Sequence, residues 1–200
     1  MVRILSKSDS LMVSERILTG GESSLVTGTE KPFLNILKRE ELLHWMLASF
    51  GENDRKPGLG AFNFDNKEYY HMPVPEYMAD WDIGTLELIN HLVVARVWGP
   101  AWAGIEITGY TDNQSAMHLL RHGRSRSEHR LDIAREFASI QQQYRFLWTS
   151  EYVSTKDNVL SDCLSRWGNP EAREKFYKIT EGSSIREVFI PDYFLQIENA

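Results

Sequence analysis

Polar and apolar residues alternate in the first half of this chain, and apolar residues recur at helical spacing in the second half. The turn Pro57-Gly58 leads into an expected strand at residues 59–64, and a polar turn separates this strand from another at residues 68–74. Residues 34–49 suit either a helix or an alternating strand, and we favour a short helix or turn that runs into a strand from about Leu42. The three strands predict an antiparallel meander.

Helices and strands then follow one another to the end of the domain. Asp80-Trp81-Asp82 precedes a helix with apolar residues on one face, which Gly99-Pro100 ends. The next elements are expected as a strand at 104–111, helices at 114–120 and 127–142, a strand at 146–153 and a helix at 160–167. This order predicts an α/β fold in which helices cover a mixed sheet.

The length and composition fit a single domain with short additions at both ends. The chain has 200 residues, of which 42% are hydrophobic, enough for one substantial core. Residues 1–33, rich in Ser, Thr and Gly, are expected to form a flexible N-terminal extension, and residues 34–168 the domain. Residues 169–200 are expected to form a tail whose apolar patch at 188–195 docks on the domain or on a partner.

Composition and spacing exclude several classes of protein. A single cysteine, Cys163, excludes an internal disulfide and a multi-cysteine zinc site. No apolar run approaches the roughly 20 residues that span a bilayer, and the N-terminus turns polar too early for a signal peptide. We therefore expect an intracellular protein, cytoplasmic or nuclear, that does not enter a membrane. His118, His122 and His129 have no partners at metal-site spacing, so zinc is not expected.

Charge is distributed unevenly along the chain. The net charge of −6 argues against general adhesion to nucleic acid, because such binding depends on neutralising phosphates with Lys and Arg. Basic residues nevertheless concentrate in one short segment, and the arginines predicted to bind nucleic acid are Arg121, Arg124, Arg126 and Arg130. A solvated helix face is the alternative interpretation.

Three carboxylates occur where the expected elements could bring them together. Asp112 ends an apolar strand, Glu87 lies within the helix that follows Asp82, and Asp162 begins the last helix of the domain. Carboxylate oxygens are the ligands that Mg²⁺ prefers, so the arrangement favours a nuclease-like metal site. Taken singly, each residue also suits a simpler role: a helix cap at Asp112, an exposed helix position at Glu87, and an ion pair of Asp162 with Arg166.

Four blocks between residues 42 and 167 carry a resemblance to a known family. In chain order they are Gly58-Leu59-Gly60-Ala61-Phe62, Leu86-Glu87-Leu88, Tyr110-Thr111-Asp112-Asn113-Gln114-Ser115-Ala116 and Asn158-Val159-Leu160-Ser161-Asp162-Cys163-Leu164-Ser165-Arg166. Their order and expected strand and helix context resemble the ribonuclease H superfamily. More narrowly, they resemble the ribonuclease H domain that follows the polymerase in retroelement reverse transcriptases.

The resemblance implies a fold, a reaction and a set of partners. The implied fold is a mixed five-stranded sheet, made of a three-stranded antiparallel meander plus parallel strands and flanked by helices. The implied reaction is hydrolysis of the RNA strand of an RNA–DNA hybrid by two metal ions, Mg²⁺ or Mn²⁺. Glu87, Asp112 and Asp162 would be the catalytic metal ligands, and a polymerase domain or chain would be a partner.

The chain departs from the family in its first strand, where an aspartate followed by a small residue and Ser is expected. Met46-Leu47-Ala48-Ser49 stands there, so Leu47 replaces a ligand and cannot bind Mg²⁺. Asp54, in a polar loop, is the only nearby substitute. Three interpretations stay open: an active ribonuclease H-type enzyme, an inactive module of the same fold that binds nucleic acid or a partner protein, and an isolated gene fragment.

Overall fold

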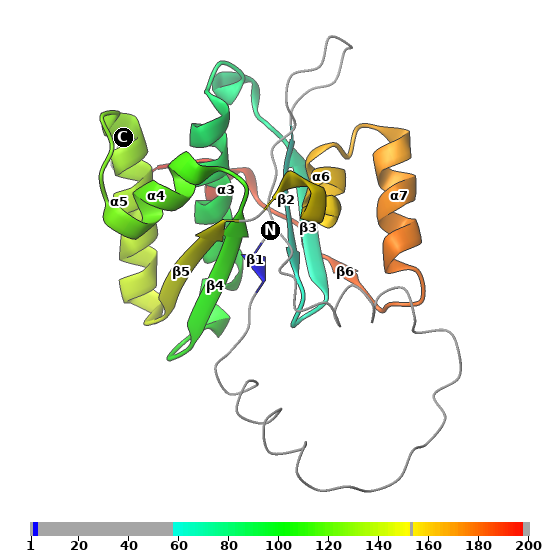
Figure 1. Cartoon of the computed structure of the whole chain (residues 1–200). Coiled ribbons are helices and arrows are strands. Elements are labelled where there is room, and N and C mark those ends of the chain that lie inside the picture. The colour runs from blue at the N-terminus through cyan, green and yellow to red at the C-terminus, as the bar shows by residue number, and fades with distance from the viewer. Residues whose placement is uncertain (1, 4–57, 153, 198–200) are drawn as a thin grey trace, which may run out of the picture.

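The computed structural model describes residues 2–3, 58–152 and 154–197. Several expectations lie outside these residues: the N-terminal extension, the strand expected from about Leu42, the replacement at Leu47 and the candidate ligand Asp54. The described part is a mixed α/β fold in which strands are flanked by helices (Figure 1). The expected α/β class is confirmed at this level.

The described strands form two three-stranded sheets, each with one antiparallel and one parallel pairing. In the first sheet β4 (Glu106–Thr111) pairs antiparallel with β1 (Val2–Arg3) and parallel with β5 (Leu147–Tyr152). In the second, β3 (Glu68–Pro73) pairs antiparallel with β2 (Gly58–Asn63) and parallel with β6 (Arg186–Glu187).

The mixed pairing was expected, whereas the division into two sheets was not. The strands of the antiparallel β2–β3 hairpin and of the parallel β4–β5 pair match the predicted strands to within two residues at each end. Among the described strands no single five-stranded sheet forms. β1 lies against both β2 and β4 (Figure 1), but its two residues pair only with β4, so no ladder of described strands joins the two halves.

The four helices predicted for the domain are present, and three of them begin at a capping side chain. They are α3 (Ile83–Trp98), α4 (Gln114–His122), α5 (Glu128–Tyr144) and α6 (Val159–Ser165). Asp82, Asn113 and Ser127 each accept a hydrogen bond from a backbone N–H in the first turn of α3, α4 and α5 respectively. In the described ranges no helix combines the length and apolar character that crossing a membrane would require.

Helix α7 (Pro170–Thr180) lies in the segment that we expected to form a docking tail, and no helix was predicted there. Asn169 caps it by accepting the N–H of Glu171, and Pro170 occupies the first helical position. Ala172, Phe176 and Thr180 share its buried face at a spacing of four residues. The apolar spacing was visible in the sequence, but three positions on a short helix are a weak signal beside the longer apolar patch that follows.

Helices cover both faces of the second sheet. Tyr70 points toward α3, where its hydroxyl donates to Asn90 Oδ1 over 2.6 Å, and Asn90 Nδ2 donates to the carbonyl of Gly60 over 3.0 Å. Tyr69 points to the other face and packs on Phe176 of α7, with ring centroids 4.9 Å apart. Neighbouring side chains of a strand point to opposite faces, so β3 contributes to two hydrophobic layers.

The C-terminal residues lie along the domain. Arg96 of α3 donates from Nη1 to the carbonyls of Phe194 and Gln196, both over 2.6 Å. Around these contacts the chain forms a short 3-10 helix, η4 (Asp192–Leu195), whose Leu195 is buried. An ion pair of Arg186 with Glu68, and a contact of His71 Nε2 with Glu187 Oε1 over 2.9 Å, hold β6 beside β3. Three further 3-10 turns are η1 (Glu76–Met78), η2 (Gly99–Ala101) and η3 (Thr155–Asp157).

Candidate functional site

Glu87 is connected to the end of β4 through the residue that precedes Asp112. Glu87 lies on α3 and is only 3% exposed. Thr111, the last residue of β4, donates from Oγ1 to Glu87 Oε2 over 2.8 Å. The same hydroxyl oxygen accepts the backbone N–H of Asn113 over 3.1 Å, which fixes the turn that carries half-buried Asp112 into α4. Two of the predicted carboxylates therefore belong to one corner of the fold.

Asp162 has a different environment. It lies in the first turn of α6, a helix that packs on β2 and β3, and forms an ion pair with Arg166 over 2.8 Å. This i,i+4 pair was the simpler of its two predicted roles. Burial raises the pKa of the Asp162 carboxyl above its ordinary value, although Arg166 and Lys175 oppose the rise. The surroundings thus disfavour the charged form, which is the form that a metal ion would need.

The described residues do not by themselves fit a two-metal site. Mg²⁺ needs several oxygen ligands at one point. In residues 2–3, 58–152 and 154–197, no group of three or more His, Cys, Asp or Glu side chains is placed to hold a metal ion. Position 47 and the candidate ligand Asp54 lie outside those ranges. The Mg²⁺ or Mn²⁺ site stays a prediction, and no catalytic step can be derived from the described carboxylates.

Two of the four arginines predicted to bind nucleic acid form hydrogen bonds with other elements of the fold. Arg121 donates from Nε to the carbonyl of Ser150 on β5 over 2.6 Å. Arg130 of α5 donates to Thr85 Oγ1 over 2.8 Å and to Ser115 Oγ over 2.9 Å, and it also pairs with Asp82. Arg130 thereby ties the first turns of α3 and α4 to α5. Its role is at least partly structural.

The Arg130 contacts also determine the charge of Asp82. Burial alone would raise the pKa of this carboxyl, but hydrogen bonds from Thr85 and Arg130 together with the charge of Arg130 hold it below its ordinary value. The carboxylate is therefore stabilised in its charged form as the cap of α3.

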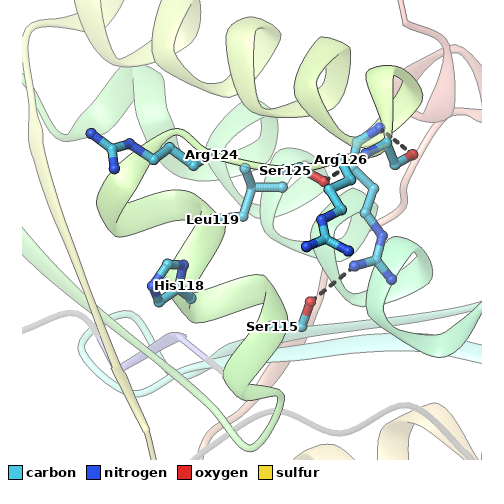
Figure 2. Close-up of a pocket in the computed structure, with 8 residues that line it drawn as sticks. Ser115, His118, Leu119, Arg124, Ser125 and Arg126 are labelled. Atoms are coloured by element: carbon cyan, nitrogen blue, oxygen red, sulfur yellow. Dashed lines mark hydrogen bonds between the residues drawn. The ribbon is translucent and has the colours of Figure 1, made fainter.

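The other two arginines, Arg124 and Arg126, belong to the loop that joins α4 to α5. Both side chains are exposed, and neither forms a hydrogen bond or ion pair with a described residue. Figure 2 shows Arg124 extending to one side of the loop and Arg126 to the other. These guanidinium groups are accordingly available to an external anion.

This loop and the two helices form an open pocket of about 420 Å³. Its lining consists of three arginines, three serines, a histidine and a leucine: Ser115, His118, Leu119, Arg124, Ser125, Arg126, Ser127 and Arg130 (Figure 2). We call these eight residues the α4–α5 pocket. Cationic groups beside hydroxyl donors can neutralise and hydrogen-bond the oxygens of a phosphate group, so the pocket can bind anions.

Sequence patterns did not reveal all the residues that complete the Glu87–Asp112 corner and the α4–α5 pocket. Thr111 was noted only as part of a motif, although it orients Glu87. Ser125 and Ser127 line the pocket, and the backbone N–H of Ser127 donates to Ser125 Oγ over 3.1 Å. The alternation Arg124-Ser125-Arg126-Ser127 was the available signal. Only the folded conformation of the loop shows that these residues line the same pocket as Ser115.

Comparison with known proteins does not assign the chain to a family. No protein-family model, no curated protein and no solved structure matches it.

Proposed function

We propose that the protein is a ribonuclease H-like domain that binds the sugar-phosphate backbone of nucleic acid, specifically of an RNA–DNA hybrid, through the α4–α5 pocket. The observation that carries this proposal is that Arg124 and Arg126 line an open pocket on a chain of net charge −6. Both side chains are exposed and have no ion-pair partner among the described residues. On a chain with a net negative charge, the electrostatic field outside the pocket repels nucleic acid. Binding is therefore restricted to the pocket.

The choice of an RNA–DNA hybrid as the ligand follows from the four sequence blocks and their order. Recognition of such a hybrid depends on groove shape, phosphate contacts and the 2′-OH rather than on base sequence. For the phosphate contacts the pocket offers guanidinium groups at Arg124 and Arg126, and hydroxyl groups at Ser115, Ser125 and Ser127. A polymerase domain or chain as partner remains part of the same proposal.

Replacement of both arginines, Arg124→Gln together with Arg126→Gln, is expected to weaken hybrid binding by about tenfold or more at low salt. Each lost phosphate contact should also reduce the slope of log affinity against log salt by about one. Fluorescence anisotropy of a labelled hybrid over a series of salt concentrations measures both effects.

The matched control removes the same charge from another helix. Arg173→Gln with Lys178→Gln changes two residues of α7, which lies on the opposite side of the molecule from α5 (Figure 1). The control should keep the affinity of the parent chain. Equal losses of affinity in the two double variants would show that binding depends on the net charge of the chain and not on the pocket.

A second candidate function is hydrolysis of the RNA strand, as the resemblance implies. The contact of Glu87 with Thr111, next to Asp112, favours it because two candidate ligands belong to one corner. Leu47 opposes it, since the family places an aspartate there.

Cleavage of a labelled hybrid in Mg²⁺ and then in Mn²⁺ separates the two candidate functions. We expect no cleavage by the parent chain and measurable cleavage by Leu47→Asp, abolished again when Asp112→Asn is added. Cleavage by the parent chain that Asp112→Asn abolishes would instead establish an active enzyme and point to Asp54 or another group as the missing ligand.

A further inference from the structure

The α4–α5 loop presents a serine immediately before a long helix. Gly123 ends α4 with a positive φ of 63°, and residues 124–127 lead directly into α5. Ser127 is exposed, its backbone is extended (φ −91°, ψ 118°), and its Oγ accepts the N–H of Arg130 over 3.4 Å. The hydroxyl is therefore accessible on a short surface segment and is held by a long hydrogen bond.

Basic side chains precede this serine at short intervals. Arg126 and Arg124 stand one and three positions before Ser127, and both are exposed without a hydrogen-bond partner in the described part of the chain. Charge patterns of this kind are among the features by which protein kinases distinguish substrates. Ser125 has one arginine before it in the loop and is half-buried, so it is the poorer acceptor.

We infer that Ser127 is a phosphorylation site for an arginine-directed serine/threonine kinase, and that its phosphorylation prevents the α4–α5 pocket from binding a nucleic-acid backbone. In this reaction Ser127 Oγ attacks the γ-phosphorus of ATP and forms an O–P bond while the bond from that phosphorus to ADP breaks. The hydroxyl proton passes to the kinase's carboxylate base, and the products are ADP and phosphoserine. The inference rests on the nucleic-acid binding proposed above.

The surroundings of Ser127 favour a bound phosphate. The group would stand at the N-terminus of α5, a helix of 17 residues, where backbone N–H groups and the helix dipole stabilise negative charge. Arg126 and Arg130 line the same cavity. A phosphoserine carries a charge of about −1.5 to −2 near neutral pH. It would therefore offset most of the positive charge of the pocket and occupy the place of a backbone phosphate.

The pair Ser127→Asp and Ser127→Asn separates charge from structure. Both residues cap helices about as well as serine, so α5 should start normally in either variant. Ser127→Asp is expected to bind the hybrid severalfold more weakly than Ser127→Asn, because both variants lose the same hydroxyl and only the aspartate adds a negative charge to the pocket. Equal affinities for the two variants would overturn the inference.

The direct test uses the full chain, ATP and a serine/threonine kinase that prefers arginine before its target. Peptide mass spectrometry should find the phosphate on Ser127, and the phosphorylated chain should bind the labelled hybrid about tenfold more weakly than the unmodified chain. Phosphate found only at other serines, or an unchanged affinity, would overturn the inference.

Phosphorus NMR gives a readout that does not need nucleic acid. The charges of the nearby arginines should lower the second pKa of the phosphoserine in the folded chain below that of a phosphorylated peptide spanning residues 121–132, where a value of about 6 is normal. Identical titrations in chain and peptide would overturn the inference. If the unmodified chain fails to bind the hybrid, the proposed function fails, and the phosphorus titration still tests how the pocket holds a phosphate.

Discussion

Gly60→Ala is expected to lower the free energy of unfolding by about 1–3 kcal/mol, because an added methyl group has no space between β2 and α6. A Cβ built at Gly60 would lie 2.5 Å from Cβ of Leu164, 2.8 Å from its carbonyl carbon and 3.0 Å from the nitrogen of Ser165. Two of these three atoms belong to the helix backbone, so rotation of a side chain cannot relieve the clash. Urea unfolding of the full chain measures the change.

Gly168→Ala is the matched control for this substitution. Nothing lies within 4 Å of a Cβ built there. We expect its stability to stay within about 0.5 kcal/mol of the parent chain. If Gly60→Ala proved as stable as Gly168→Ala, the close packing of α6 on β2 would be contradicted, and with it the position of Asp162, which α6 carries.

The second large effect is acid destabilisation through His91. This residue is fully buried on α3, and burial lowers its pKa to about 3, although its hydrogen bond to the Glu87 carbonyl opposes the decrease. Its Nδ1 donates to that carbonyl over 2.8 Å, so the neutral ring carries its proton on Nδ1. Protonating the second nitrogen would place a charge in the core beside Trp148, whose ring centroid is 5.9 Å away.

Acid destabilises the folded chain because His91 has different pKa values in the folded and unfolded states. An unfolded histidine titrates near pH 6.5, whereas His91 in the folded chain stays neutral down to about pH 3. Between these values the unfolded chain binds a proton that the folded chain does not. The neutral state of His91 therefore costs the folded chain no stability above about pH 6.5. As the pH falls below this value, the free energy of unfolding decreases by about 1.4 kcal/mol per pH unit.

Unfolding measured between pH 7 and pH 5 checks this prediction. His91→Gln should show a smaller loss of stability over this interval than the parent chain, whatever its stability at pH 7. His122→Gln, which changes an exposed histidine of α4, is the matched control for the replacement of a histidine by glutamine. A slope that is the same in all three chains would assign the acid sensitivity to other groups.

His91 lies in the same corner of the fold as two of the candidate carboxylates. Its ring is bonded to the carbonyl of Glu87, and the side chain of Glu87 is held by Thr111 beside Asp112. Local loss of structure on protonation of His91 would therefore reach these carboxylates before it reached the α4–α5 pocket. Binding through the pocket and any hydrolysis at Asp112 should accordingly differ in their tolerance of acid.

Sequence patterns were most informative where local rules apply. Asp82, Asn113 and Ser127 begin their helices because a side-chain oxygen accepts a backbone N–H three residues further on. Helix α7 was missed, although Asn169 and Pro170 form an equally local start. The long apolar patch that follows α7 indicated a docking segment. The apolar periodicity of one short helix was a weaker signal than this patch.

The candidate site was predictable only in part. Glu87 and Asp112 were selected by the sequence, but Thr111, which joins them, has no distinguishing pattern. The sequence offered no means to separate Arg130, which is bound to Thr85 and Ser115, from Arg126, which has no hydrogen-bond partner among the described residues. The difference depends on partners that are distant in the chain.

By itself the sequence determined which residues form the strands β2 to β5 and the helices α3 to α6, because turns, caps and periodicity act within a few residues. Only the tertiary structure decided that Arg130 meets Thr85 across 45 positions of the chain and that Gly60 lies against α6. It also decided that the arginines and serines of one loop share a cavity with Ser115. Such contacts depend on how the elements pack, and packing selects among side chains that a local pattern treats as equivalent.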